Sequence, residues 1–377
     1  MTASNTLNVD AVSDQTTAMT TAAGNSYSAA VETGDVNVQS TQSMQGNASA
    51  TTIVNVTTDA GLQVSMATEG TGNTGEADTL GGGALTGTFH QTTGPVSITT
   101  ESQLNADTAQ AGDIAISDNA IANTQGIGAV GGSANATITQ TSQALTQSNG
   151  GGNLLYTPGT ATWSALAVSN NVTATGTDGS TQTLNVNQSM TGDRTQAAQF
   201  LGIGSAQTVI NAVTATGNNV SASNDGGDLN VVTVQDNEGY LRAQAESAAF
   251  EFGTSSVIAT GVGNSVMAGE TGGQVTVNNL QTNGGAGVDV LATSAGTDGY
   301  DLSSSATAMG NAATGFACTV CGGRMTVANS QTNSADIGAT STVNLGVGTG
   351  GSARSATGVA TAVGNSATFY VSRPTGG

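Results

Sequence analysis

The sequence predicts an all-β protein folded as a β-solenoid, or β-helix, of about eight repeats of ~47–50 residues. Three observations predict this fold: an Asn and a Gln that recur together, an alternation of apolar and polar residues before each Gln, and a scarcity of aromatic side chains. A regular period is interpreted first, because each repeat then forms one unit stacked on its neighbours.

The first observation is the recurring pair of amides. Gln42 stands 17 residues after Asn25, and the later units keep separations of 17, 18 or 20 residues. The Asn positions are Asn25, Asn73, Asn123, Asn171, Asn218, Asn264, Asn311 and Asn365, and the Gln positions are Gln42, Gln91, Gln140, Gln188, Gln235, Gln281 and Gln331. We expect structural ladders at both positions, because stacked amide side chains bond to one another. For the Gln an alternative stays open, in which the strand bends and the side chain points outward.

A bend is expected at the Asn position. The preceding residue is Gly in most units, as in Gly24, Gly72 and Gly217. Gly and Asn both tolerate positive φ, so this dipeptide predicts a turn repeated at one corner of every coil.

The second observation is a period of two before each Gln. In the first unit Val36 and Val38 enclose Asn37, and the central position is Asn or Thr in all seven units. This alternation predicts a strand with one buried face. A repeat of about 47 residues is long for one coil, so we expect two coils per repeat and a rod of roughly 75 Å. The alternative is one coil with three or four short strands.

The repeats divide the chain into three parts. Residues 1–20 are predicted to form an N-terminal cap segment, residues 21–366 the solenoid array, and residues 367–377 a C-terminal strand and tail. Residues 238–252 are unusually rich in large and charged groups, which fits either a short helix or a decorated strand.

The third observation is composition. The chain of 377 residues has 54 Gly and only 3% aromatic residues, so a narrow core of small aliphatic side chains fits better than a wide globular core. Tyr156, Pro158 and Trp163 fall in a stretch that resembles a loop. Disorder is disfavoured, because it explains neither the period nor the alternation.

The net charge of the chain limits which molecules it can bind. The chain has 25 acidic residues against five basic ones, all Arg, and a formal net charge of -20. Such a surface repels phosphate, which argues against nucleic-acid binding. No run of 18 apolar residues and no basic, apolar leader occur in this sequence, so no membrane helix or signal segment is expected within it.

Catalysis is poorly supported, and we expect no enzyme. His90 is the single His, which excludes sites built from several His residues, and it fits an outward or packed strand position. Asp225 and Asp228 form a carboxylate pair of the kind glycan-acting enzymes use, but they lie in a Gly-rich turn where solvated acids are common. No cofactor is expected; Ca²⁺ at such acidic turns is a weaker alternative.

Cys318 and Cys321 are the only cysteines. They precede two Gly in a strand-like stretch, so a local disulfide in an oxidising compartment is the favoured interpretation. Two reduced thiols are the alternative. Zinc would require two further ligands, which the single His does not supply.

The motifs resemble a known family. Gly24-Asn25-Ser26, Val36-Asn37-Val38, the stretch 42–50 and the stretch 72–77 are similar to the holdfast anchor proteins of stalked bacteria, the D component. Over most of the chain the resemblance is carried by such short motifs. The Gln-x-x-x-Gly-Asn-x-Ala unit at Gln42 is also similar to curlin repeats. The unit 362–367 is similar to the head repeats of trimeric autotransporter adhesins, but no membrane anchor follows it here.

The holdfast resemblance implies a structural adhesion protein on the cell surface, associated with the bacterial outer membrane. It implies that the protein anchors an adhesive polysaccharide, beside a curlin-like companion and a secretion lipoprotein in the outer membrane. We further expect the protein to contact itself or its partners by β-strand stacking, as a homo-oligomer or fibre. The alternative function is a β-helix enzyme, a hydrolase or lyase that acts on glycans.

Overall fold

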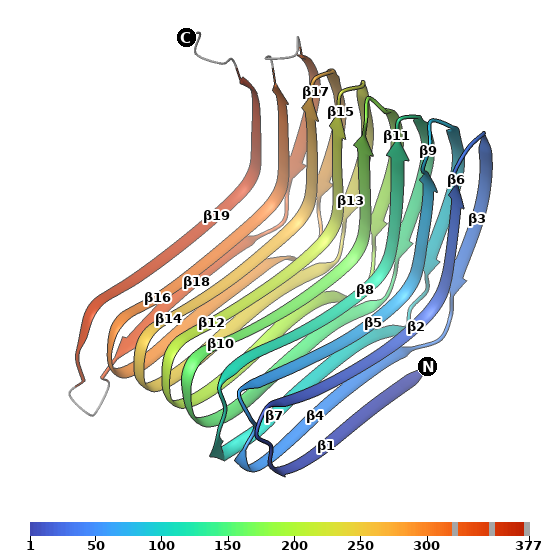
Figure 1. Ribbon diagram of the computed structural model, residues 1–377. Helices are drawn as coiled ribbons and strands as arrows, with labels where there is room; N and C mark the ends of the chain where they lie inside the picture. Colours follow the sequence, from blue (N-terminus) through green and yellow to red (C-terminus); the bar gives the residue numbers. More distant parts are fainter. Residues whose placement is uncertain (319–322, 347–350, 373–377) are drawn as a thin grey trace, which may run out of the picture.

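The structure is a computed structural model that describes residues 1–318, 323–346 and 351–372. Within these ranges all regular structure is β-strand, and every paired strand runs parallel to its neighbour. Figure 1 shows the strands stacked side by side along one axis, from β1 and β3 at the N-terminal end to β19 at the C-terminal end. The predicted all-β solenoid is confirmed.

Each coil has three faces. The first face contains β1 (Thr2–Ala11), β4 (Ala48–Asp59), β7 (Ser97–Gln110) and β18 (Ile337–Leu345). The second contains β2 (Gln15–Val31), β5 (Gln63–Thr79), β8 (Asp113–Val130) and β19 (Ala353–Ser372). Four long strands bend from the first face into the second: β10 (Leu145–Thr177), β12 (Arg194–Asp225), β14 (Tyr240–Thr271) and β16 (Gly287–Cys318).

The third face is a separate sheet of seven strands. Its members are β3 (Val36–Met44), β6 (Ala84–Thr93), β9 (Ser133–Ser142), β11 (Thr181–Met190), β13 (Leu229–Asn237), β15 (Gln274–Asn283) and β17 (Arg324–Asn333). These are the strands that the alternation before each Gln predicted.

The number of coils per repeat differs from the expectation. Asn25 lies opposite Asn73, and Gln42 opposite Gln91, so one repeat is one coil. The expected two coils per repeat are wrong, because strands of up to 33 residues turn a wide coil that uses the whole repeat. The first face has eight layers, so the described stack is roughly 35 Å long, about half the expected rod.

The two ends of the chain lie in the same stack. Residues Thr2 to Val9 of β1 pair with Ser49 to Val56 of β4. At the other end β19 runs past Asn365 and pairs with β16 as far as Ser372. Residues of the segments 1–20 and 367–372 therefore extend the same parallel sheet as the repeats between them.

The strands of the second face are bent (Figure 1), and the burial pattern of β5 changes at the Asn position. In β5 the alternation stops there, and Gly70 to Asn73 are four consecutive buried residues. The predicted positive φ at this corner is wrong, since among the described residues positive φ occurs elsewhere. Gly72 is needed for close approach instead: a Cβ there would lie 2.3 Å from the carbonyl oxygen of Ala122 in the next coil.

Positive φ is used at the turn between the second and third faces. In the six coils whose turn is fully described, one Gly adopts it there: Gly34, Gly82, Gly131, Gly179, Gly226 and Gly272. These turns hold several of the acidic residues, so the chain reverses direction where its charges reach solvent.

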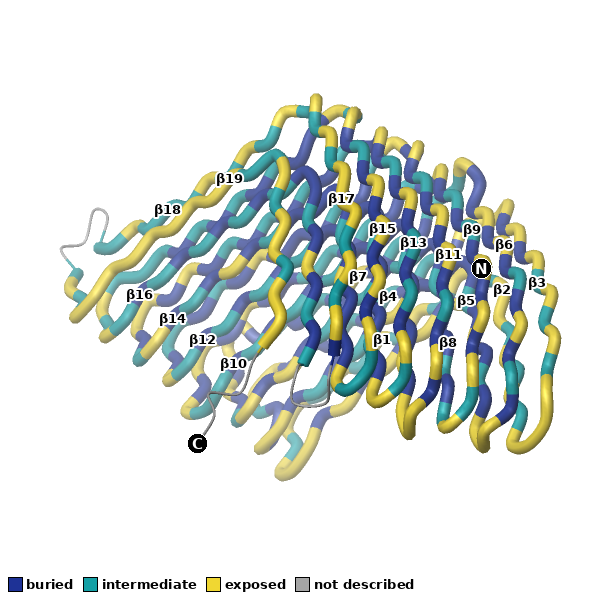
Figure 2. Tube along the Cα trace, turned by 90° about the horizontal axis from the view of Figure 1, so that it is seen from above, coloured by how far each residue is buried: buried dark blue, intermediate teal, exposed yellow. Residues whose placement is uncertain are grey.

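The interior is narrow, and buried residues alternate with more exposed ones along much of the stack, as the dark and light bands of Figure 2 show. Trp163 is its largest fully buried side chain and belongs to β10, so the loop-like assignment of that stretch is wrong. Residues 240–252 are part of β14, which makes the decorated strand the correct alternative and excludes the helix.

A polar seam crosses this interior between the first and second faces. The Thr68 hydroxyl donates to Thr52, and Thr52 donates to Thr20, both at 2.7 Å. The carboxylate of Asp118 is fully buried beside Ser102, whose hydroxyl donates to it. Burial is the main cause that raises the pKa of Asp118 from 3.8 to about 7.

Asp118→Asn tests the cost of this buried acid. The unfolded chain loses the proton near pH 4, but the folded chain keeps it to about pH 7. Wild-type stability therefore falls as pH rises through that window, in total by about 4 kcal/mol. We expect the variant to match the wild type in urea unfolding near pH 3.5 and to be more stable at pH 8.

The control is Asp107→Asn, which changes an exposed acid of β7. It should leave the pH dependence as it is in the wild type. Parallel stability curves for Asp118→Asn and the wild type would contradict the assigned role of burial.

Candidate functional site

The Asn side chains of the second face form one continuous ladder. In each step the Nδ2 of one Asn donates to the Oδ1 of the Asn in the next coil, at 2.7 or 2.8 Å. The members in order are Asn25, Asn73, Asn123, Asn170, Asn218, Asn264, Asn311 and Asn365.

One predicted member is corrected. Asn170, not Asn171, occupies the ladder, and Asn171 is half-buried with its side chain on the outer surface of the second face. There Asn171 accepts from Asn219 at 2.8 Å and donates to Thr124. The error arose because two adjacent Asn residues were both compatible with the spacing to Gln188.

The Gln side chains of the third face point inward and form a second ladder. Here the Nε2 of each Gln donates to the Oε1 of the Gln in the preceding coil, at 2.7 or 2.8 Å. It joins Gln42, Gln91, Gln140, Gln188, Gln235, Gln281 and Gln331. The two ladders therefore donate in opposite directions along the axis.

Each ladder also ties the second and third faces together. Asn25 donates to the carbonyl of Ser43 on the third face, and Gln42 donates to the carbonyl of Thr74 on the second, at 3.0 and 2.9 Å. The same pair of bonds recurs in every later coil up to Asn311 and Gln331. These carbonyls fix which end of each amide is the donor, because only the NH₂ group can donate.

Sequence reasoning missed two smaller ladders. Asn237, Asn283 and Asn333 stand two residues after the Gln and bond at 2.6 Å. On the outer surface of the first face the Nδ2 of Asn105 donates to Asn55, and that of Asn55 to Asn8, at 2.7 Å. The signal for the first was an Asn at a constant distance from Gln235, Gln281 and Gln331.

The other residues singled out from the sequence do not converge. Asp225 accepts from the hydroxyl of Thr271, and Asp228 from the backbone N–H of Gln274, both in the next coil. His90 is exposed on β6. In the described part of the chain no three His, Cys, Asp or Glu side chains gather as metal ligands.

Cys318 ends β16, whereas Cys321 lies outside the described residues. The disulfide between them therefore stays a prediction. Among the described residues no helix is both long and apolar enough to span a membrane.

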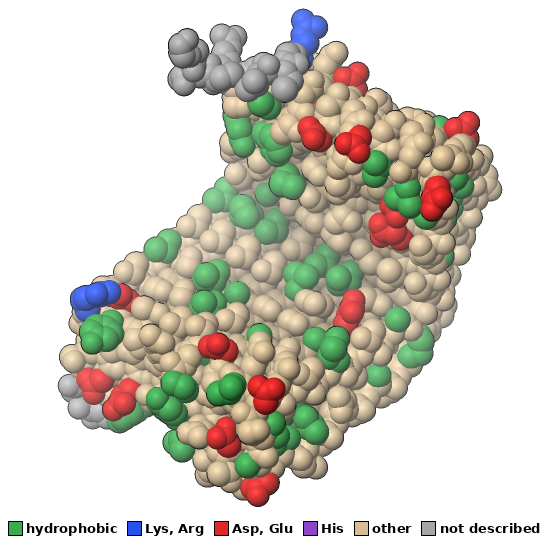
Figure 3. Space-filling view, viewed as in Figure 1, with side chains coloured by type: hydrophobic (Ala, Val, Ile, Leu, Met, Phe, Trp, Pro, Cys, Tyr) green, Lys and Arg blue, Asp and Glu red, His purple; other side chains and the backbone are tan. Residues whose placement is uncertain are grey.

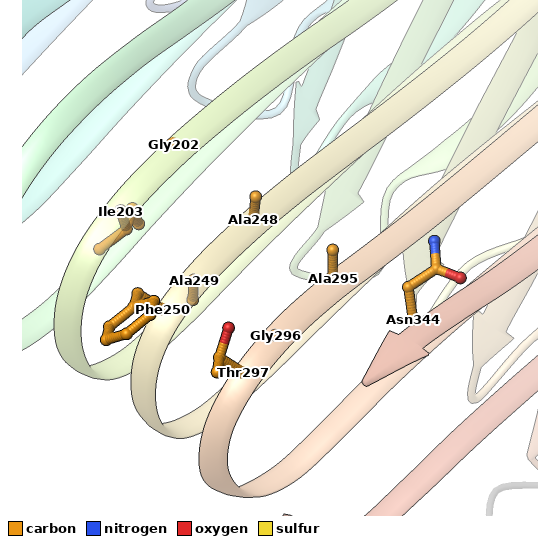
Figure 4. Close-up of a pocket in the computed structure, with 9 residues that line it drawn as sticks. All are labelled: Gly202, Ile203, Ala248, Ala249, Phe250, Ala295, Gly296, Thr297 and Asn344. Atoms are coloured by element: carbon orange, nitrogen blue, oxygen red, sulfur yellow. The ribbon is translucent and has the colours of Figure 1, made fainter. Parts of the chain in front are cut away.

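A row of shallow hollows lies along the corner between the first and second faces. We call this corner the aromatic edge; it comprises residues 153–160, 200–208, 246–254 and 293–301 on β10, β12, β14 and β16. One hollow of about 380 Å³ has a floor of Gly202, Ala248 and Ala295 and is bordered by Phe250 and Asn344. Figure 4 shows Phe250 at the bend of β14, with Ala248 and Ala295 side by side on neighbouring strands.

Exposed apolar and acidic side chains alternate on this side of the molecule. Figure 3 shows both kinds next to each other along its lower border. A second hollow is bordered by Phe200 and Glu246, and a third by Tyr156, Glu251 and Asp298. The sequence did not reveal this grouping, because the aromatic residues occupy different positions within their repeats.

One comparison with known proteins identifies a family. A family model described as Holdfast attachment protein D matches residues 10–287. No curated protein and no solved structure matches the chain.

Gln140→Met tests the contribution of one ladder step. Methionine fills a similar volume, but it removes the bonds from Gln140 to Gln91 and to the carbonyl of Asn171, and the bond from Gln188 to Gln140. Three buried polar groups lose a partner, so we expect a loss of about 3 kcal/mol in the free energy of unfolding.

Denaturant unfolding measures this loss. The matched control is Thr137→Val, an exposed position of the same strand, which should change stability little. Equal stability of Gln140→Met and Thr137→Val would show that the ladder is dispensable.

Proposed function

The chain belongs to the Holdfast attachment protein D family, and from this we propose that it is a structural protein that anchors or scaffolds an adhesive polysaccharide at the bacterial cell envelope. Family membership itself implies a role in holdfast attachment and a position at the cell surface. Association with the outer membrane and the anchoring mechanism are parts of the proposal.

One observation supports a mechanical role most directly. Through the seven coils that have a described strand on the third face, each coil is tied to the next by three sets of backbone pairs and by two amide ladders. Such a stack resists being pulled apart along its axis, because separating two coils breaks many hydrogen bonds at once. A protein that holds an adhesive on a cell needs this property.

The proposed contacts follow from strand edges. At the two ends of the described stack, β1 to β3 and β17 to β19 each have one side that pairs with no other described strand. Such an edge is a template for another strand. The proposed partners are a second copy, other anchor proteins and a secretion lipoprotein of the outer membrane, together with the polysaccharide.

The enzyme alternative has less support. A glycan-cleaving site needs two carboxyl groups facing one cleft, whereas Asp225 and Asp228 are each bonded to the adjacent coil. The net charge of -20 likewise disfavours nucleic acid as a partner.

Deleting the gene in a cell that makes the adhesive tests anchoring. We expect the mutant cells to produce the adhesive but to release it into the medium, so that surface attachment falls strongly. Lectin staining of cells and of the cell-free medium measures both quantities. An adhesive that stays on the mutant cells at the wild-type level would refute the proposal.

Negative-stain imaging of the purified protein tests stacking between copies. We expect rods or fibres several times longer than the ~35 Å of one stack. Samples with Ca²⁺ and with a chelator show whether the acidic turns take part. Dispersed single particles under both conditions would argue against strand stacking as the means of assembly.

A further inference from the structure

The aromatic edge exposes a large share of the chain's few aromatic side chains. The whole chain has six Phe, five Tyr and one Trp. Tyr156, Phe200, Phe250 and Tyr300 are 42%, 49%, 57% and 63% exposed, and they lie on four successive long strands, β10, β12, β14 and β16. Exposing so many rings along one corner is costly in water, which points to an interaction.

Two shallow hollows lie between the rings. These hollows of about 380 and 320 Å³ share a floor of Gly202, Ala248 and Ala295, and Phe250 borders one while Phe200 borders the other. The two rings are therefore separated by a continuous surface of small residues. A flat ring lying on that floor can contact an aromatic face at either side.

Hydrogen-bonding groups border the same surface. Asn153 and Glu246 line the hollow beside Phe200, and Asn344 lines the one beside Phe250. An apolar floor with a few polar groups at its rim is the usual composition of a ligand site. Tyr300 differs from the other rings, because the guanidinium of Arg354 already lies 5.7 Å from its centroid.

Charge and backbone pairing narrow the class of ligand. Glu246, Glu251 and Asp298 give the edge a negative potential, and Arg354, which lines a further hollow beside Tyr300, is paired with Asp301. An acidic polymer is therefore repelled. Along β12 and β14 the backbone is already paired with neighbouring coils, so an extended peptide finds few free groups for strand addition.

We propose that the aromatic edge binds a polysaccharide chain that carries no acidic groups, a neutral or an amine-bearing one. A sugar ring has an apolar C–H face, which fits the exposed rings, and a rim of hydroxyls, which fits the amides and carboxylates. A linear glycan crosses several coils, so weak contacts of single sugar units add up along the chain. This inference rests on the proposed function and locates the glycan contact on the protein.

The test compares a double variant with a matched control. Phe200→Ala/Phe250→Ala removes two exposed rings, and Val234→Ala/Leu280→Ala removes two exposed side chains that lie opposite each other on the third face. The probes are hydroxyethyl cellulose, which is neutral, chitosan oligosaccharide, which bears amines, and polygalacturonate, which is acidic. Binding is measured by affinity electrophoresis and by calorimetry. Both use 150 mM salt, because at this concentration electrostatic attraction is screened over about 8 Å.

The expected result has three parts. The wild type binds at least one of the neutral and amine-bearing probes and does not bind polygalacturonate. The double variant binds at least about tenfold more weakly, because two stacking contacts are lost. The control binds like the wild type, and circular dichroism shows the same fold in all three proteins.

Three outcomes would overturn the inference. The wild type binds no probe, or only the acidic one; the double variant binds as tightly as the control; or the double variant alters self-association alone, which would make the edge a contact between copies. Returning each variant to the deletion strain separates this inference from the anchoring role. Full attachment with the double variant would count against the edge only, whereas unchanged attachment in the deletion strain counts against anchoring itself.

Discussion

The structure depends on the in-register stacking of buried amides. Inside each ladder a side chain such as Gln140 has its two donors and its oxygen occupied, partly by the neighbouring coil and partly by the opposite face. A shift by one residue would leave these groups buried without partners, at about 1–3 kcal/mol for each. The ladders therefore fix the register between strands of adjacent coils, which backbone hydrogen bonds alone would specify only weakly.

Small side chains make this arrangement compatible with a narrow coil. At several steps of the Asn ladder the backbones of adjacent coils approach closely, and Gly72 or Gly217 permits that approach. Differences in repeat length are absorbed away from the ladders. In β10 and β12 the pairing shifts by one residue between Thr157 and Thr160, beside Pro158, and the new register then holds through Asn170 and Asn218.

The same architecture accounts for a role in attachment. A rigid stack carries load between its ends and presents the same surface position once per coil, which suits contact with a repetitive polymer. The amide ladders and the proposed glycan-binding surface lie in different parts of the coil. The ladders tie the second face to the third, whereas the aromatic edge lies between the first and second faces.

The sequence by itself determined the period, the strands of the third face and the amides that recur in them, because hydrogen bonding and burial act at the same position in every repeat. It also carried the family, through short motifs around Asn25 and Gln42. It did not decide whether Asn170 or Asn171 belongs to the Asn ladder, since spacing alone does not distinguish adjacent amides. Only the tertiary structure decided that one repeat is one coil of three faces, and that Tyr156, Phe200 and Phe250 share an edge. The reason is physical: periodicity records which residues are equivalent, whereas the closed path of the backbone decides which inequivalent residues become neighbours.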